Sequence, residues 1–103
     1  MLELPIDITT NALKEIKNII QHKGIPEEYA LRIGIKGGGC GASFLLGFDK
    51  PKKSDLTYHY EGITVLIEKA HLMYLVNLQV DFEETSEGVG FTFTNVSLSK
   101  VEK

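Results

Sequence analysis

Residues 36–44, with the sequence KGGGCGASF, hold four glycines and the only cysteine of the chain. Apolar residues alternate with other residues over 31–36, which predicts a β-strand with one buried face, and they alternate again over 44–48. Two strands joined by a short glycine-rich segment form a hairpin, so the sequence predicts a hairpin that presents Cys40 at its turn. The glycines allow backbone conformations and close approaches that side chains would prevent.

The segment 9–23 is expected to be a helix, because its apolar residues fall on one face. Thr9 or Thr10 can cap its start, and Gly24 followed by Pro26 supplies a stop. The apolar positions of this face are Leu13, Ile16, Ile19 and Ile20.

Further elements follow from the same periodicities. Residues 57–60 and 63–68 are expected to pair across Glu61 and Gly62, and residues 69–76 to form a short helix. The last two strands are expected at 78–84 and 89–94, joined by a glycine-containing turn.

This order of elements predicts an α+β fold, a compact β-rich domain of mixed or antiparallel strands with an N-terminal helix and one short internal helix. At 103 residues the chain is expected to be a single domain, 1–103, in which residues 96–103 form a frayed tail.

Composition excludes several classes of protein. With 11 basic and 14 acidic residues the chain lacks the basic face of a nucleic-acid binder, so no nucleic acid is expected as a partner. No apolar segment has the length of a bilayer span, and the first residues do not have the pattern of a secretory signal. One cysteine fits a reducing compartment, so a cytoplasmic protein is expected, and an intermolecular disulfide in a dimer stays open.

A glycine-rich segment of this kind has three chemical uses, which are phosphate binding, nucleophilic catalysis by the cysteine and ligation of a soft metal. It lacks the Gly-Lys-Ser/Thr ending of a phosphate-binding loop and leads into a strand. A nucleophilic cysteine needs a base, and the sequence places no histidine beside Cys40. A thiolate is a preferred ligand of iron–sulfur clusters, although these usually have four such ligands. A structural role of Cys40, as an exposed thiol in a tight turn that binds no metal, stays open as an alternative.

Other polar and aromatic residues are expected to have structural roles. His22 lies in the last turn of the first helix, His59 faces solvent on a strand, and His71 lies on the short helix. Asp49 and Asp81 are expected in turns or caps. The five phenylalanines are expected in the core; they are Phe44, Phe48, Phe82, Phe91 and Phe93. A solvated acidic face is expected near the last hairpin, formed by Glu83, Glu84 and Glu87.

Four motifs in order, LRIGIKGGGCGASFLLGFD, GITVLIEK, YLVNLQVDFEE and EGVGFTFTN, resemble those of the A-type iron–sulfur cluster carriers, or HesB-like proteins. The resemblance extends from the first helix to about Asn95. It implies a single HesB-like domain, a homo-oligomer, and a role in carrying iron or an iron–sulfur cluster to recipient proteins.

By this resemblance Cys40 is the first of the family's three cluster cysteines, with the backbone of Gly39 and Gly41 beside the metal. The other two belong to a Cys-Gly-Cys motif, where this chain reads NVSLSKVEK and has no cysteine. The chain also has Val96 where the family usually has proline. Asn77 replaces a usual glycine, and asparagine tolerates the left-handed conformation better than most residues.

The leading hypothesis is a non-enzymatic iron-binding or cluster-binding protein of the iron–sulfur assembly system that uses Cys40 in an oligomer. Its partners would be assembly or recipient proteins of the iron–sulfur system, and no membrane is expected as a partner. Two alternatives on the same fold are a cluster-free interaction module and a redox-responsive thiol protein. An enzyme is the poorest interpretation, because no nucleophile–base pair, carboxylate pair or cofactor motif is present.

Overall fold

The computed structural model describes residues 3–36 and 43–95, which form two compact units. Of the described residues, one unit consists of 3–4, 25–36 and 43–75, and the other of 5–24 and 76–95. The single domain expected over residues 1–103 stays a prediction. The tail expected at 96–103 lies outside the described residues.

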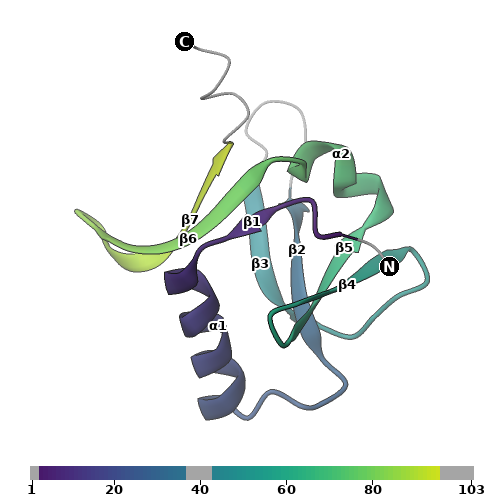
Figure 1. Cartoon of the computed structure of the whole chain (residues 1–103), viewed down its shortest axis with the longest axis horizontal. Coiled ribbons are helices and arrows are strands. Elements are labelled where there is room, and N and C mark those ends of the chain that lie inside the picture. Colours follow the sequence, from purple (N-terminus) through teal and green to yellow (C-terminus); the bar gives the residue numbers. More distant parts are fainter. Residues whose placement is uncertain (1–2, 37–42, 96–103) are drawn as a thin grey trace. The chain divides into compact units, whose positions relative to one another are not determined.

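The first unit is built on a four-stranded sheet with the order β3-β2-β5-β4 (Figure 1). β2 pairs with β3 in antiparallel and with β5 in parallel orientation, and β4 and β5 are antiparallel, so the sheet is mixed as expected. The bounds are β2 Ala30–Lys36, β3 Ser43–Asp49, β4 Asp55–Tyr60 and β5 Ile63–Glu68, followed by the 3₁₀ turn η1 Lys69–His71 and α2 Leu72–Leu75.

The turn between β4 and β5 has the backbone that the sequence predicts. Glu61 and Gly62 both have positive φ angles, 48° and 86°, as a tight two-residue hairpin requires. The strands on either side pair from Asp55↔Glu68 to Tyr60↔Ile63.

The core of the first unit comes mainly from the two central strands and α2. Its fully buried side chains include Leu31, Ile33, Val65, Leu66, Ile67 and Leu75. The alternation over 31–36 predicted one buried face for this strand, which is wrong: Arg32 and Gly34 are buried as well. The polar partners of Arg32, described below, are what make its burial acceptable.

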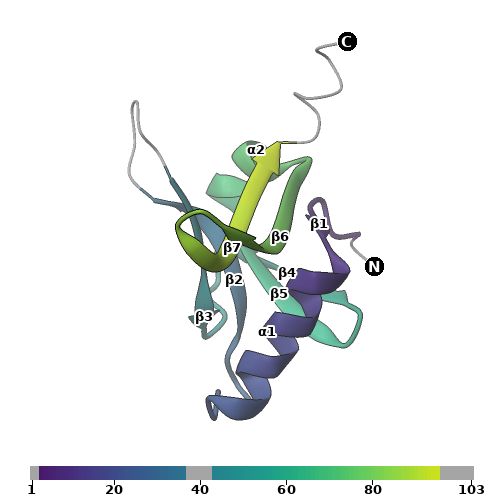
Figure 2. The ribbon, with the colours of Figure 1, turned by 90° about the vertical axis from the view of Figure 1, so that its left-hand side faces the viewer.

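The second unit contains a three-stranded sheet with the order β1-β6-β7 and one long helix. β1 runs parallel to β6, and β6 and β7 form an antiparallel hairpin, with α1 below it in Figure 2. The bounds are β1 Asp7–Ile8, α1 Thr10–His22, β6 Leu78–Thr85 and β7 Gly88–Asn95. The buried apolar residues are Ile6, Ile8, Ala12, Ile16, Leu78 and Val80.

Helix α1 has the cap that the sequence predicts. The Thr9 hydroxyl accepts a hydrogen bond from the Ala12 N–H at 3.2 Å and donates one to Asp81. At the other end the Lys23 N–H donates to the Ile19 carbonyl at 2.9 Å, before Gly24. Of the predicted apolar face, Ile16 is fully buried, and the others are half-buried.

Two local expectations had different outcomes. Asn77 has a φ of 68°, the left-handed conformation that its replacement of glycine predicted. The expectation that the phenylalanines form the core is wrong, because the buried core is aliphatic apart from Tyr58. Phe44 is 38% exposed, and Phe82 and Phe91 are half-buried, packed edge to face with centroids 4.9 Å apart. The α+β class itself, β-rich with a long and a short helix, is confirmed.

Candidate metal site

The β2–β3 hairpin frames the segment that carries the cysteine. The two strands pair continuously from Ala30↔Asp49 to Lys36↔Ser43, which confirms the predicted hairpin. Cys40, Gly39 and Gly41 belong to the residues between Lys36 and Ser43, and they lie outside the described residues. Their roles therefore stay predictions, but the strand ends that lead to them are fixed next to each other.

The described end of this hairpin includes apolar side chains at the surface. Phe44 and Leu45 are each 38% exposed, and Lys36 and Ser43 are exposed beyond them. This end of the sheet therefore gives solvent or a second molecule access to residues next to the cysteine segment.

His71 contacts the same end of β2 from η1. Its Nδ1 accepts a long hydrogen bond, 3.4 Å, from the Ile35 N–H, so the ring proton is assigned to Nε2. A Cβ atom at Gly34 would lie 2.8 Å from Nδ1. Gly34 thus gives the imidazole the room to reach the backbone of β2.

This contact was missed by the sequence analysis, which placed His71 correctly on the short helix but gave it no partner. Residues 35 and 71 are too far apart in sequence for any periodicity to link them. A usable signal was Gly34, because a glycine inside a strand often marks a close approach by another group.

At the opposite end of the hairpin, Arg32 lies in a cluster of charges. Its Nη1 and Nη2 each donate to an oxygen of Asp55 at 2.7 Å, and its Nε donates to Asp49 at 3.2 Å. Nη2 also donates to the Lys50 carbonyl at 3.2 Å. The Asp55 side chain is 1% exposed, so the pair is almost completely desolvated.

The charged groups of this cluster shift one another's pKa values. The hydrogen bond from Arg32 holds the pKa of Asp55 below its usual value, against the opposing effect of burial. The pKa of Asp49 is also lowered, first by the hydrogen bond from the Lys50 N–H and then by Arg32. The pKa of Arg32 is raised, chiefly by its hydrogen bond with Asp55. These carboxylates therefore serve the fold, as expected for Asp49.

Asp81 has a similar structural role in the other unit. It accepts hydrogen bonds from the Thr9 hydroxyl and, at 2.8 Å, from the Phe82 N–H. Asp81 lies within β6, so the turn that was expected there is wrong; its carboxylate instead holds the hydroxyl of Thr9, the residue that caps α1.

The other histidines have local partners. His22 Nδ1 donates to the Asn18 carbonyl at 2.9 Å in the last turn of α1, and the exposed His59 lies 3.4 Å from the Thr64 hydroxyl. Within residues 3–36 and 43–95, no three His, Cys, Asp or Glu side chains group together closely enough to hold a metal ion.

The acidic residues expected on a solvated face are exposed on the β6–β7 hairpin. Glu83 accepts a hydrogen bond from Thr92 at 2.8 Å. Among the described helices, none has the length and apolar character needed to cross a membrane.

Comparison with known proteins identifies relatives along nearly the whole chain. The sequence model of the family described as iron-sulphur cluster biosynthesis matches residues 4–101. The iron–sulfur cluster insertion protein ErpA of Aeromonas salmonicida is 39% identical over 99 residues, which cover 93% of this chain and 84% of that protein.

Solved structures agree with this result. A crystal structure of IscA with the [2Fe-2S] cluster matches with a TM-score of 0.68 and 27% identity, over 87% of this chain and 81% of the other. The crystal structure of Escherichia coli SufA matches with a TM-score of 0.72 over 93% of this chain and 90% of the other; at 21% identity this supports the fold alone.

Proposed function

Because the chain belongs to the iron-sulphur cluster biosynthesis family and is an iron–sulfur cluster assembly protein, we propose that it carries iron or a cluster bound through Cys40. The metal is cargo: it is bound, held and passed to a recipient protein, and the chain catalyses no reaction of its own. Gly39 and Gly41 would let the backbone approach the cargo closely.

The observation that carries this proposal is the pairing of β2 with β3 up to Lys36↔Ser43. The pairing fixes both ends of the segment that contains the only thiol at one end of the sheet. Exposed side chains surround these ends, so a second molecule can reach them. A thiolate is a good ligand for iron in either form of the cargo.

One thiolate per chain sets the stoichiometry. A [2Fe-2S] cluster normally has four protein ligands, so one chain cannot supply all of them from cysteine. We infer that two chains share the cargo through two Cys40 thiolates and that glutathione, water or a recipient's cysteine completes the coordination. Fewer protein ligands also make release to a recipient easier.

Anaerobic reconstitution with ferrous iron and sulfide tests this proposal. The parent chain, Cys40→Ala and the control Ser43→Ala, at the exposed start of β3, are compared by visible absorption and by iron and sulfide per chain. Colour in the parent and in Ser43→Ala, lost in Cys40→Ala, together with a shift to a dimer on loading, supports the proposal. Equal iron and sulfide in all three proteins contradicts it.

A cluster-free interaction protein on the same fold is the second candidate. It is favoured by the absence of any cysteine besides Cys40. In this case none of the three proteins takes up iron, and the parent still binds an assembly partner. A redox-responsive thiol is distinguished by its rate with a thiol reagent, which would exceed that of an unperturbed cysteine.

We also propose a cytoplasmic location. A chain whose one thiol must stay reduced to bind iron requires a reducing compartment.

A further inference from the structure

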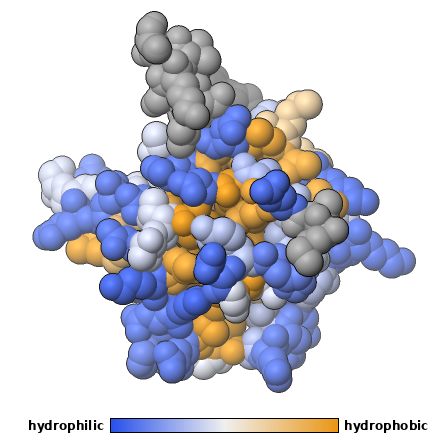
Figure 3. Space-filling model, viewed as in Figure 1, coloured by the Kyte–Doolittle hydropathy of each residue, from blue (hydrophilic) through white to orange (hydrophobic). Residues whose placement is uncertain are grey.

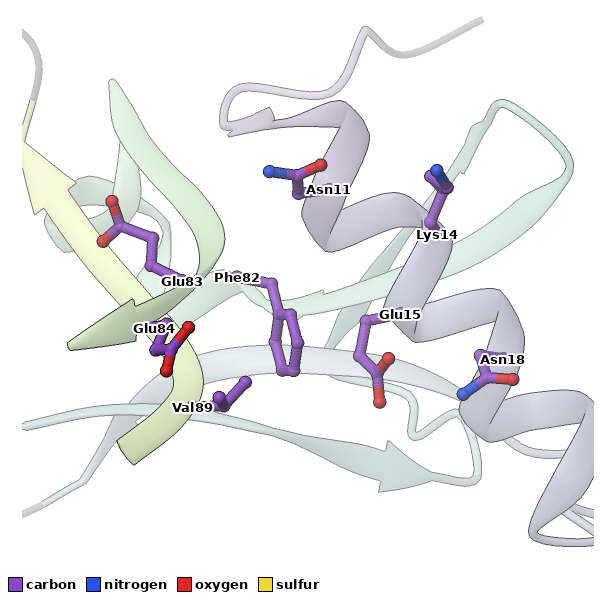
Figure 4. Close-up of a pocket in the computed structure, with 8 residues that line it drawn as sticks. All are labelled: Asn11, Lys14, Glu15, Asn18, Phe82, Glu83, Glu84 and Val89. Atoms are coloured by element: carbon purple, nitrogen blue, oxygen red, sulfur yellow. The ribbon is translucent and has the colours of Figure 1, made fainter. Parts of the chain in front are cut away.

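The second unit contains a groove that the proposed iron chemistry does not use. It has a volume of about 550 Å³ and lies between α1 and the β6–β7 hairpin (Figure 4). Phe82 points into the space between the two elements, and Glu15 and Glu84 approach it from opposite sides.

One wall of the groove is polar. It consists of a single stripe of α1, at the helical spacings of three, four and seven residues from its first member. These residues are Asn11, Lys14, Glu15 and Asn18.

The other wall belongs to the hairpin and combines apolar and acidic side chains, which are Phe82, Glu83, Glu84 and Val89. Phe82 pairs with Phe91, and Glu84 pairs with Val89, so these four side chains share a face of the two strands. The same face is buried at Val80 and open at Val89, which is 62% exposed. Figure 3 shows apolar surface along the lower edge of this hairpin, among hydrophilic residues.

The charge of the groove is negative. Glu15 lies on one wall and Glu83 and Glu84 on the other, and Lys14 is the only basic residue among those that line the groove. Glu83 accepts a hydrogen bond from Thr92, but the Glu15 and Glu84 carboxylates have no hydrogen bond or ion pair with another residue of the described part of the chain. Both are therefore available to a cationic partner.

We propose that this groove binds a basic, amphipathic segment of another protein. An apolar side chain of the segment packs on Phe82 and Val89, and flanking Lys or Arg side chains pair with Glu15 and Glu84. Charge complementarity selects this occupant, because a basic segment offsets the carboxylates while its apolar side chain covers the exposed hairpin face.

A second copy of this chain fits the groove less well. The net charge of the chain is −3, so two acidic surfaces would repel each other. Its one basic run, KPKK at residues 50–53, contains no large apolar side chain to pack on Phe82.

A titration of the ¹⁵N-labelled full chain, followed by NMR, tests the proposal. The probe is the synthetic peptide acetyl-KLKKFLKK-amide, and the control probe has Glu in place of each Lys. We expect the basic peptide to shift the amide resonances of residues 11–18 and 82–89 selectively, and to bind more weakly as salt is added. The acidic peptide should leave these resonances unchanged.

Variants separate the groove from general electrostatic attraction. Glu84→Lys and Val89→Ser, both at exposed positions that leave the core intact, should each weaken binding about tenfold or more. Glu28→Lys makes the same charge change at an exposed site in the other unit and should change binding less than about twofold. Cys40→Ala should bind the peptide like the parent, whatever the result for iron.

Three results would overturn the proposal. The first is equal binding of the basic and acidic peptides, or no shift with either. The second is a loss in Glu28→Lys as large as that in Glu84→Lys. The third is a shift of the groove resonances with protein concentration alone, which would make a second copy the occupant.

Discussion

The two ends of the β2–β3 hairpin are held in different ways. At one end Arg32 makes four hydrogen bonds, three of them to carboxylate oxygens, and Asp55 is almost fully buried. At the end that leads to Cys40, the Ile35 N–H donates one long hydrogen bond, 3.4 Å, to His71 Nδ1.

This difference separates stability from function within one pair of strands. The charged cluster fixes the register and the β3–β4 connection at the end away from the cysteine. At the end next to the cysteine the hydrogen bond to His71 is long and uncharged, so its loss should cost less free energy than the loss of the charged cluster. The segment that we propose to hold the cargo follows that end.

The largest effect is expected from Arg32→Met. This substitution leaves the buried Asp55 carboxylate without its cation, and such a loss typically costs about 3–5 kcal/mol. Urea denaturation of the parent and the variant at pH 7 measures the change in the free energy of unfolding. The double variant Arg32→Met/Asp55→Leu removes the isolated charge and should recover most of the loss. A loss below about 1 kcal/mol in the single variant would show that the cluster does not dominate this end.

A smaller effect is expected from pH. The pKa of Asp55 is lowered in the folded state, by Arg32 first, so this carboxylate stabilises the fold above its unfolded pKa of about 4. The stabilisation is lost as the pH falls through the lower, folded pKa. Urea denaturation from pH 7 to pH 3 should therefore show a falling stability in the parent and a flatter profile in Asp55→Asn. Parallel profiles would contradict the assignment to Asp55.

Local patterns in the sequence predicted most of the elements. The alternation over 31–36 and 44–48 identified β2 and β3, and Thr9 and Gly24 located the ends of α1, because these signals act between neighbouring residues. The two-residue strand β1 was missed. It is too short for a periodic pattern, and its parallel partner β6 lies 72 residues further on.

The candidate site was predictable only in part. Cys40 and its glycines are predicted to form the site because composition and family motifs mark them directly, and their role stays a prediction. The partners of Arg32 and His71 could not be found in this way, because Asp55 and Ile35 are 23 and 36 residues distant. The groove on α1 and the β6–β7 hairpin also needed the fold, since its two walls are distant in sequence.

The smallest effect, and the sharpest comparison, involves two glycines of the same hairpin. In Gly34→Ala the new Cβ would lie 2.8 Å from His71 Nδ1, so the ring must move and its hydrogen bond with Ile35 is lost. We expect a loss of about 1–2 kcal/mol in the free energy of unfolding. Gly47→Ala places its Cβ in open space on β3 and should be neutral or stabilising by about 0.5 kcal/mol.

The double variant Gly34→Ala/His71→Ala completes the test of the weaker end. With the imidazole removed, the alanine at 34 meets no obstacle, so its cost should disappear or change sign relative to His71→Ala alone. Hydrogen exchange of the Ile35 amide should be faster in both His71→Ala and Gly34→Ala, because each removes its acceptor. An equal cost of Gly34→Ala with and without His71 would mean that the strand backbone, and not the imidazole, requires glycine at this position.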